Sequence, residues 1–278
     1  MVACVLVSGP NKANPESPVP RKLTRQGNSP TLWTHTAQFL GIGILGPLFY
    51  LLSFVFGPTA AQVTRTVKSR TIRPEYYTLL FPIILVLHNL EVFGAYLHPS
   101  FETRNYWVWA WQLSPLWVGI ANFVAAKTIG RGSGRSSRKN SSSPPNTGSI
   151  EKLLLGVGLI SAGVWISLLV YAPYSLSEIF IPVRERQTDL ILHARRALQI
   201  DQLFSFGASF LWLVYSVAEL QWTGGAAGKV PGGVFAIMAL LPVLTVAFGP
   251  GVALLAGWYA RELIIRGAKT TAVRSVKS

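Results

Sequence analysis

The chain has 278 residues, of which 50% are hydrophobic and only 13% are charged, and its 25 lysines and arginines outweigh 11 acids to give a net charge of +14. A soluble domain carries about 25% charged residues, so this composition excludes an ordinary soluble protein and predicts an integral membrane protein. The basic residues gather in loops and tails between apolar runs, which predicts a lipid bilayer with anionic headgroups as the partner and no nucleic acid.

The first apolar run, residues 33–56, is predicted to be the first transmembrane helix. Its three glycines would let a second helix approach closely. Residues 1–32 are rich in Pro, Ser, Asn and Lys, a composition that predicts a disordered tail. Residues 57–75 carry four basic side chains before their first acid, the positive-inside signature of a cytosolic loop.

The second apolar run, residues 76–98, places a carboxylate well inside a predicted span. A helix of roughly 20 residues crosses the hydrocarbon core, and an intramembrane carboxylate is costly unless it is neutralised or paired. Glu91 shares a helix face with His88 and His98, because residues three and four apart lie on the same side. This face predicts Glu91 and His88 as catalytic residues. A structural hydrogen bond from Glu91 to a neighbouring helix is the alternative.

The third predicted span, residues 107–126, opens with three tryptophans, which are typical of a membrane interface. Trp107 and Trp111 also share a helix face with Asn122. Together with the polar face of the second span, this stripe predicts an internal cavity in which Trp107, Trp111 and Asn122 bind substrate.

Residues 127–152 are rich in Gly, Ser, Pro and basic residues, which predicts a flexible cytosolic linker. The linker divides the chain into two predicted three-helix halves, residues 33–126 and 153–265. The second half contains an amphipathic stretch at 173–200, expected to lie on the membrane as a surface helix or cap, and a basic tail follows at 266–278. The predicted fold is an all-α integral membrane bundle of about six transmembrane helices, with seven as the alternative.

The fifth predicted span begins at Asp201 and carries Glu219 near its end, five helical turns away on the same face. Trp212 and Tyr215 share this face and are predicted to bind substrate. Taking the basic loops as cytosolic places Asp201 at the level of Glu91, so Asp201 is predicted to be the second catalytic carboxylate. Helix capping by Asp201 is one alternative, and Glu219 as the partner of Glu91 is the other.

The last apolar region, residues 232–265, is longer than one span needs. Pro242 and the sequence Gly-Pro-Gly at 249–251 interrupt it. Proline breaks helices, so we expect either one kinked helix or a span followed by a short re-entrant piece.

The residue counts exclude several kinds of metal and cofactor chemistry. Aspartate occurs only at positions 189 and 201, so no Asp-rich cluster can hold magnesium and a diphosphate. Four histidines are too few for the di-iron site of a membrane desaturase, and no cysteine near the spans supports a haem thiolate. Neither a nucleotide-binding Gly-rich loop nor a Gly-x-Ser-x-Gly elbow occurs. We therefore expect no metal and no cofactor.

Acid–base chemistry on an apolar ligand remains. Desolvation raises the pKa of a carboxylic acid in a water-poor site, so that such a group keeps a proton near neutral pH and can donate it. A donated proton opens an epoxide or protonates an olefin, and the faces of aromatic side chains stabilise the resulting carbocation.

The chain resembles the small multi-span fungal terpene cyclases of ascochlorin-, ascofuranone- and macrophorin-type pathways. The resemblance rests on FGPTAAQ at 56–62, PEYYTLLFPIILVLHNLEVFGAYLHP at 74–99 and WVWAWQLSPLW at 107–117, and covers mainly the first 125 residues. It implies a metal-free enzyme of the endoplasmic-reticulum membrane that cyclises a farnesylated aromatic or its terminal epoxide, with a buried acid as proton donor. The implied pathway partners are a prenyltransferase and an epoxidase. A non-enzymatic membrane carrier or scaffold is the alternative from another class.

Overall fold

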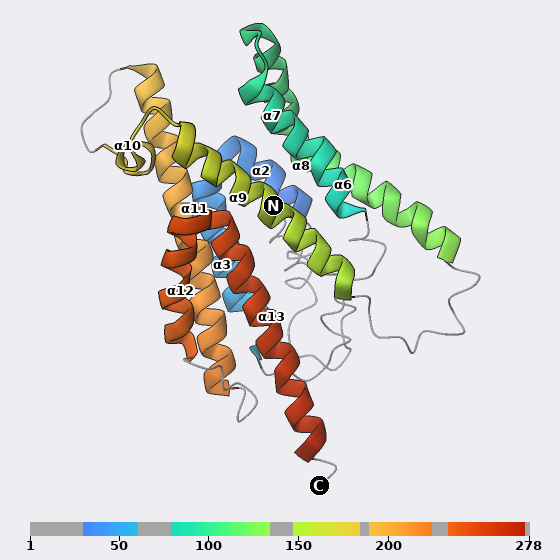
Figure 1. The fold of residues 1–278 in the computed structure, drawn as a ribbon. Coiled ribbons are helices and arrows are strands. Elements are labelled where there is room, and N and C mark those ends of the chain that lie inside the picture. Colours follow the sequence, from blue (N-terminus) through green and yellow to red (C-terminus); the bar gives the residue numbers. More distant parts are fainter. Residues whose placement is uncertain (1–29, 61–78, 134–146, 184–188, 224–232, 276–278) are drawn as a thin grey trace. The chain divides into compact units, whose positions relative to one another are not determined.

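The structure is a computed structural model that describes residues 30–60, 79–133, 147–183, 189–223 and 233–275. Every regular element in these stretches is a helix (Figure 1). The chain forms two compact units, each built from two separate stretches. Unit 1 comprises residues 1–39 and 70–157, and unit 2 comprises residues 40–69 and 158–278. This division differs from the two predicted halves, because the helix that follows residue 41 belongs to unit 2.

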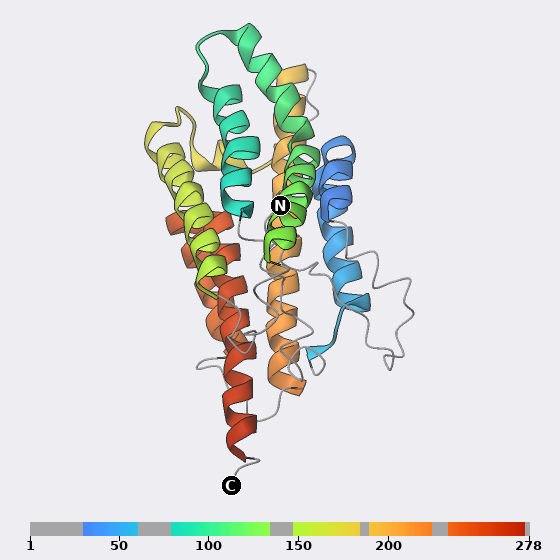
Figure 2. The ribbon, with the colours of Figure 1, turned by 90° about the vertical axis from the view of Figure 1, so that its right-hand side faces the viewer.

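Unit 1 is built around a helical hairpin. One arm consists of α6 (Leu80–Ile84), the π-helical turn η2 (Leu85–Asn89) and α7 (Leu90–Leu97), and the other arm is α8 (Phe101–Ser133). Figure 2 shows the two arms leaving their connecting turn side by side. Helices α2 (Pro30–Leu40) and the first part of α9 (Thr147–Tyr171) complete the unit.

The turn of this hairpin follows from three consecutive residues. His98 has an extended backbone (φ −63°, ψ 135°), because the ring of Pro99 disfavours a helical conformation in the residue before it. The hydroxyl of Ser100 then accepts a hydrogen bond from the Thr103 backbone N–H at 3.3 Å and so caps the start of α8. A connection this short makes α7 and α8 antiparallel neighbours.

In unit 2, α3 (Ile42–Phe56) packs against α11 (Leu190–Thr223), and the two helices run in the same direction. Gly43 lies against Asp201, and Gly46 lies one turn further along against Ser205. The second part of α9, from residue 158, and helices α10 (Leu176–Phe180), α12 (Gly233–Phe248) and α13 (Pro250–Ser275) complete the unit. Its buried core joins α11, α12 and α13 through Leu213, Val217, Ile237, Leu241 and Ala253.

The last apolar region forms two helices, α12 with 16 residues and α13 with 26 residues, so neither the single kinked helix nor the span with a short re-entrant piece is seen. Gly249 separates α12 from α13 with a φ of 90°, a left-handed conformation that favours glycine. A Cβ at this position would also meet the ring of Trp165 at 3.0 Å. Helices α12 and α13 pack against each other, and α13 extends to Ser275, so most of the predicted tail is helical.

Three described helices are long and apolar enough to cross a membrane: Leu80–Leu97, Glu151–Tyr171 and Leu190–Trp222. Helices α3 and α12 are apolar but shorter. Large hydrophobic side chains are widely exposed, as on α3, where Ile44 is 66% and Leu51 58% exposed. An apolar helix with such an exposed face is typical of contact with lipid. The number of crossings, predicted to be about six, is larger than these three candidates.

Several predicted boundaries shift in the structure. The first span is interrupted at Gly41, whose φ of 87° separates α2 from α3. Helix α8 extends seven residues into the predicted linker and α9 begins within it, so only 134–146 of the linker lie outside the described residues. Of the predicted tail 1–32, residues 30–32 are helical and 1–29 lie outside the described residues.

The amphipathic stretch 173–200 was expected to be separate from the fifth span. It contains α10 and the first turns of α11, which runs without a break into the predicted span, while 184–188 lie outside the described residues. Asp201 therefore lies eleven residues inside a helix that begins at Leu190. Its predicted position at the start of the span was wrong.

Candidate functional site

Glu91 lies on α7 and is 8% exposed. Its Oε2 is buried and has no hydrogen-bond partner within the described part of the chain. The predicted alternative, a structural hydrogen bond to a neighbouring helix, is therefore not seen for this atom. The π-helical turn η2 ends two residues before Glu91, and π-helical turns within α-helices are frequent at functional sites.

The register of α7 on α8 places Glu91 beside the tryptophan stripe. Three residues before Glu91, His88 Nδ1 lies 2.9 Å from the Ser114 hydroxyl of α8. Three residues after it, Gly94 lies on the ring of Trp107, where a Cβ would come within 2.5 Å of the indole. Each step forward along α7 is a step back along α8, so Glu91 lies at the level of Trp111. These contacts place His88, Glu91, Trp107 and Trp111 along the facing sides of the two arms of the hairpin, and their roles in catalysis and substrate binding stay predictions.

Unit 1 holds three further buried polar atoms without a partner among the described residues. They are Nε1 of Trp111 and Oδ1 of Asn122 on α8, and Nδ1 of His35 on α2. Pro115 has no N–H to donate to the Trp111 carbonyl four residues earlier, so α8 also lacks one helical hydrogen bond at this level. The side chains of Trp111 and Asn122 were predicted to bind substrate.

His35 was not predicted. Thr31, one turn earlier, packs tightly on α8: a Cβ at Gly119 would come within 2.5 Å of the Thr31 side chain. Four residues on, His35 lies on the same face of α2 as Thr31. The sequence shows His35 near the start of the first apolar run, but only the packing of α2 on α8 reveals that its face is turned inward.

Asp201 acts as a cap, although not for its own helix. Its Oδ1 accepts a hydrogen bond from the Gly43 backbone N–H at 3.1 Å, at the start of α3. The first N–H groups of a helix lack partners within that helix, and a carboxylate satisfies them and complements the helix dipole. The pairing of Asp201 with Glu91 stays a prediction, because Asp201 belongs to unit 2 and Glu91 to unit 1.

Glu219 holds the other end of α3. Its Oε1 accepts a hydrogen bond from the Ala60 backbone N–H at 2.9 Å, just beyond the end of that helix. Asp201 and Glu219 lie five turns apart on one face of α11. They contact the backbone at the start of α3 and just beyond its end. This arrangement gives Glu219 a structural contact and leaves its alternative role beside Glu91 untested.

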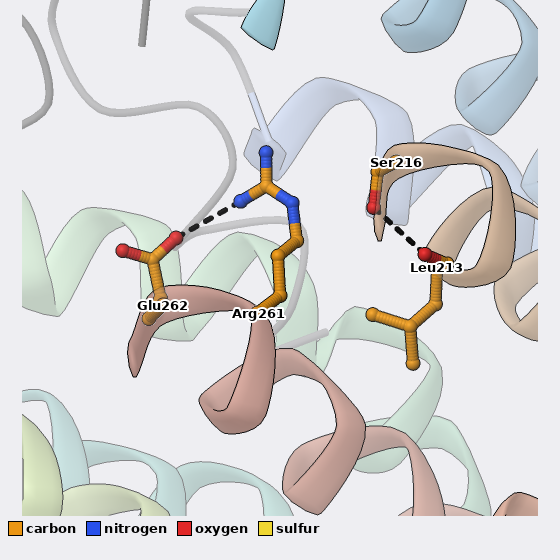
Figure 3. A network of polar contacts seen from close by, with 4 residues as sticks. All are labelled: Leu213, Ser216, Arg261 and Glu262. Carbon is orange, nitrogen blue, oxygen red and sulfur yellow. Dashed lines mark hydrogen bonds and ion pairs between the residues drawn. The ribbon is translucent and has the colours of Figure 1, made fainter. Parts of the chain in front are cut away.

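Trp212 belongs to an aromatic and charged cluster in unit 2. Its ring lies 5.5 Å from that of Tyr50, and the Arg261 guanidinium lies 5.5 Å from its centroid. Figure 3 shows Arg261 joined to Glu262, at 2.9 Å, beside the Ser216 hydroxyl, which donates to the Leu213 carbonyl. The aromatic surface of Trp212 thus already interacts with a cation.

Tyr215 is 51% exposed and lies against Phe54, with ring centroids 5.8 Å apart. Substrate binding by Tyr215 and Trp212 stays a prediction. Among the described residues, no group of three His, Cys, Asp or Glu side chains is arranged to hold a metal ion.

Comparison with known proteins matches the CtvD domain to residues 21–266. The chain belongs to the CtvD domain family. Two curated relatives are the FAD-dependent monooxygenase verC1 of Penicillium polonicum, 28% identical over 243 residues, and the FAD-dependent monooxygenase anuJ of Penicillium roqueforti (strain FM164), 27% identical over 229 residues. These matches cover 85% and 81% of the CtvD-family chain, but only 29% and 27% of the relatives. The chain therefore spans less than a third of their length. No solved structure matches.

Proposed function

We propose that this CtvD-family chain is a membrane-embedded cyclase of fungal secondary metabolism. Glu91 donates a proton to an epoxide or olefin of a prenylated aromatic polyketide and so starts cyclisation of the prenyl chain. The observation that carries the proposal is the buried Oε2 of Glu91, which has no partner in the described part of the chain and lies at the level of Trp111. An unpaired ionised carboxylate is costly inside a membrane, which supports a protonated acid at this position.

The names of the relatives favour an epoxide over an olefin as the reacting group. Both are FAD-dependent monooxygenases, and a monooxygenase that places one oxygen atom across a double bond makes an epoxide. In this proposal, the domain shared with such enzymes takes that epoxide as its substrate. The prenylated aromatic nature of the substrate rests on the resemblance of the sequence.

The proposed step is an isomerisation. The proton of Glu91 moves to the epoxide oxygen as the C–O bond to the more substituted carbon breaks, leaving a hydroxyl group and a carbocation. The π electrons of a neighbouring double bond form the new C–C bond, and a proton leaves the final cation to a base. The faces of Trp107 and Trp111 stabilise the positive charge on the way, and Glu91 is reprotonated before the next turnover.

The directions of α3 and α11 support a bundle of about six transmembrane crossings. We place this bundle in the endoplasmic-reticulum membrane. Helices α3 and α11 pack in the same direction, which requires an odd number of crossings between them. The candidate spans Leu80–Leu97 and Glu151–Tyr171 supply two. Helix α8 runs back along the first of these spans, and with 33 residues it is long enough to be the third.

The experiment compares Glu91→Gln with Glu102→Gln in microsomes supplied with a farnesylated phenol that carries a terminal epoxide. Glu102 is an exposed acid in the first turn of α8 and provides a matched control. We expect wild type and Glu102→Gln to form a cyclic isomer of unchanged mass. Glu91→Gln should lose about 100-fold or more of the rate, the usual contribution of a general acid. Equal rates in the two variants would refute the role of Glu91. A product heavier by one water molecule would show that the epoxide is hydrolysed and not cyclised.

A membrane scaffold is the second candidate, because the chain matches less than a third of each monooxygenase. Such a module would hold a flavin enzyme at the membrane without chemistry of its own. In cells that also make the monooxygenase, a scaffold predicts full product formation by Glu91→Gln, whereas the cyclase proposal predicts accumulation of the uncyclised epoxide.

A further inference from the structure

The unpartnered polar atoms of unit 1 occur at two separate levels of α8. Glu91 Oε2 and Trp111 Nε1 lie at the first level. Asn122 Oδ1 lies eleven residues further along α8. Eleven residues are just over three full turns, so Trp111 and Asn122 share a face and are about 16 Å apart along the axis.

The stretch between the two levels is apolar or already hydrogen-bonded. Ser114 is fully buried and its hydroxyl contacts His88, while Val118 is 2% exposed. On the opposing helix α6, Ile84 lies between the two levels and Leu80 lies at the level of Asn122, and they are 5% and 1% exposed. The buried face of α8 therefore carries an unpartnered polar atom at each of the two levels, and the described stretch between them offers none.

Helix α2 contacts α8 close to the second level. Thr31 packs on α8 at Gly119, three residues before Asn122. One helical turn is about 5 Å, so His35 lies within about a turn of Gly119 along α8. Its Nδ1 is buried and, like Asn122 Oδ1, has no partner among the described residues.

We propose that unit 1 binds an elongated, mainly apolar substrate at both ends, with a hydroxylated head group at Asn122 and His35 and the reacting oxygen at Glu91 and Trp111. This inference rests on the proposed function and defines its substrate class. The indole N–H of Trp111 only donates, so it pairs with an oxygen acceptor such as an epoxide. The amide of Asn122 and the ring of His35 both accept and donate, which suits a phenolic hydroxyl. The distance between the levels sets the length of the connecting chain.

The test measures equilibrium binding to the full chain in nanodiscs, in a Glu91→Gln background that removes turnover. The probes are radiolabelled hydroquinones whose prenyl chains of two, three and four isoprene units end in an epoxide, and the dimethyl ether of each. Asn122→Leu is compared with Asn105→Leu, the same replacement at an exposed position of α8. Because binding is read without catalysis, its outcome is independent of whether Glu91 acts as the acid.

We expect Asn122→Leu to weaken hydroquinone binding by about fivefold to tenfold, the effect of one lost hydrogen bond. Asn105→Leu should leave it unchanged, and Asn122→Leu should not affect the dimethyl ethers. His35→Phe should reproduce the loss. Affinity should also peak at the chain length that spans about 16 Å. Equal binding by the two leucine variants, an equal loss for the ethers, or affinity that only rises with chain length would overturn the proposal.

The melting temperature of Asn122→Leu separates ligand binding from a structural role. A leucine that replaces an unpartnered buried amide is expected to leave stability unchanged or to raise it, because an unsatisfied buried polar group destabilises the folded state. Weaker binding together with unchanged or higher stability supports the proposal. A lower melting temperature would overturn it, since Asn122 would then be a structural contact of unit 1.

Discussion

Gly43→Ala is expected to separate α3 from α11 at their closest approach. A Cβ at Gly43 would lie 2.5 Å from Oδ1 and 2.6 Å from Cα of Asp201. The Cα belongs to the backbone of α11, so the helices must move apart by about 1 Å to reach ordinary van der Waals contact. Overpacking of this kind costs about 1–3 kcal/mol. The shift also weakens the Gly43–Asp201 hydrogen bond, which to a charged acceptor contributes about 1.5–3 kcal/mol.

Gly46→Ala is the matched control, one turn further along the same face of α3. Its Cβ would meet Ser205 only at 3.7 Å, an ordinary contact, and alanine favours a helix over glycine by up to about 1 kcal/mol. We therefore expect Gly43→Ala to lose about 2–4 kcal/mol of unfolding free energy and Gly46→Ala to lose none. At about 2–4 °C per kcal/mol, thermal unfolding in detergent micelles, followed by circular dichroism, resolves this difference. Identical melting temperatures for the two variants would refute the close packing of α3 on α11.

Gly94→Ala should push α7 away from the ring of Trp107, which a Cβ would approach to 2.5 Å; a shift of about 1 Å at a catalytic group can cost about 100-fold in rate, so a variant with wild-type turnover would contradict the placement of Glu91 beside α8. Asp201→Asn keeps a hydrogen-bond acceptor for α3, so its free energy of unfolding should lie within about 1 kcal/mol of the wild-type value, whereas Asp201→Leu should lose clearly more unfolding free energy. Equal losses in the two variants would argue against capping. Ser175 and Glu178 form a capping box at the start of α10: the Ser175 hydroxyl and backbone N–H donate to the Glu178 carboxylate, which lowers the pKa of that carboxyl. The protection of the Glu178 N–H from hydrogen exchange should therefore fall as pH drops through this lowered pKa. Protection that is independent of pH would contradict the capping box. EDTA should leave turnover intact, and loss of activity restored by magnesium would show that the acidic residues had been misread.

Part of the candidate site could be predicted from the sequence because it depends on helix periodicity. Residues three and four apart share a face whatever surrounds the helix, so His88 and Glu91 could be grouped on one side of the second span. The same rule grouped Trp107, Trp111 and Asn122. The short connection at Pro99 makes the two helices antiparallel neighbours, and the contacts of His88 with Ser114 and of Gly94 with Trp107 show that these faces meet.

The sequence could not predict the neighbours of residues whose partners are distant in the chain. Asp201 was expected to lie at the start of the fifth span as a catalytic residue, with capping of its own helix as an alternative. Its partner is Gly43, 158 residues away. His35 gave no signal at all, since a single histidine near the start of an apolar run has no periodic companion.

The sequence by itself determined the helical class, the apolar character of the helices and the faces on which polar residues align, because composition and a 3.6-residue period are local properties. The tertiary structure decided which helices pack together, where Gly41 and Gly249 interrupt them, and which polar atoms find partners. Those outcomes depend on contacts between helices, as at Gly43, where the absence of a side chain lets a carboxylate of α11 reach the first N–H groups of α3. Whether an acid within an apolar helix is a cap, as Asp201 is, or lacks a partner among the described residues, as Glu91 does, follows from that packing alone.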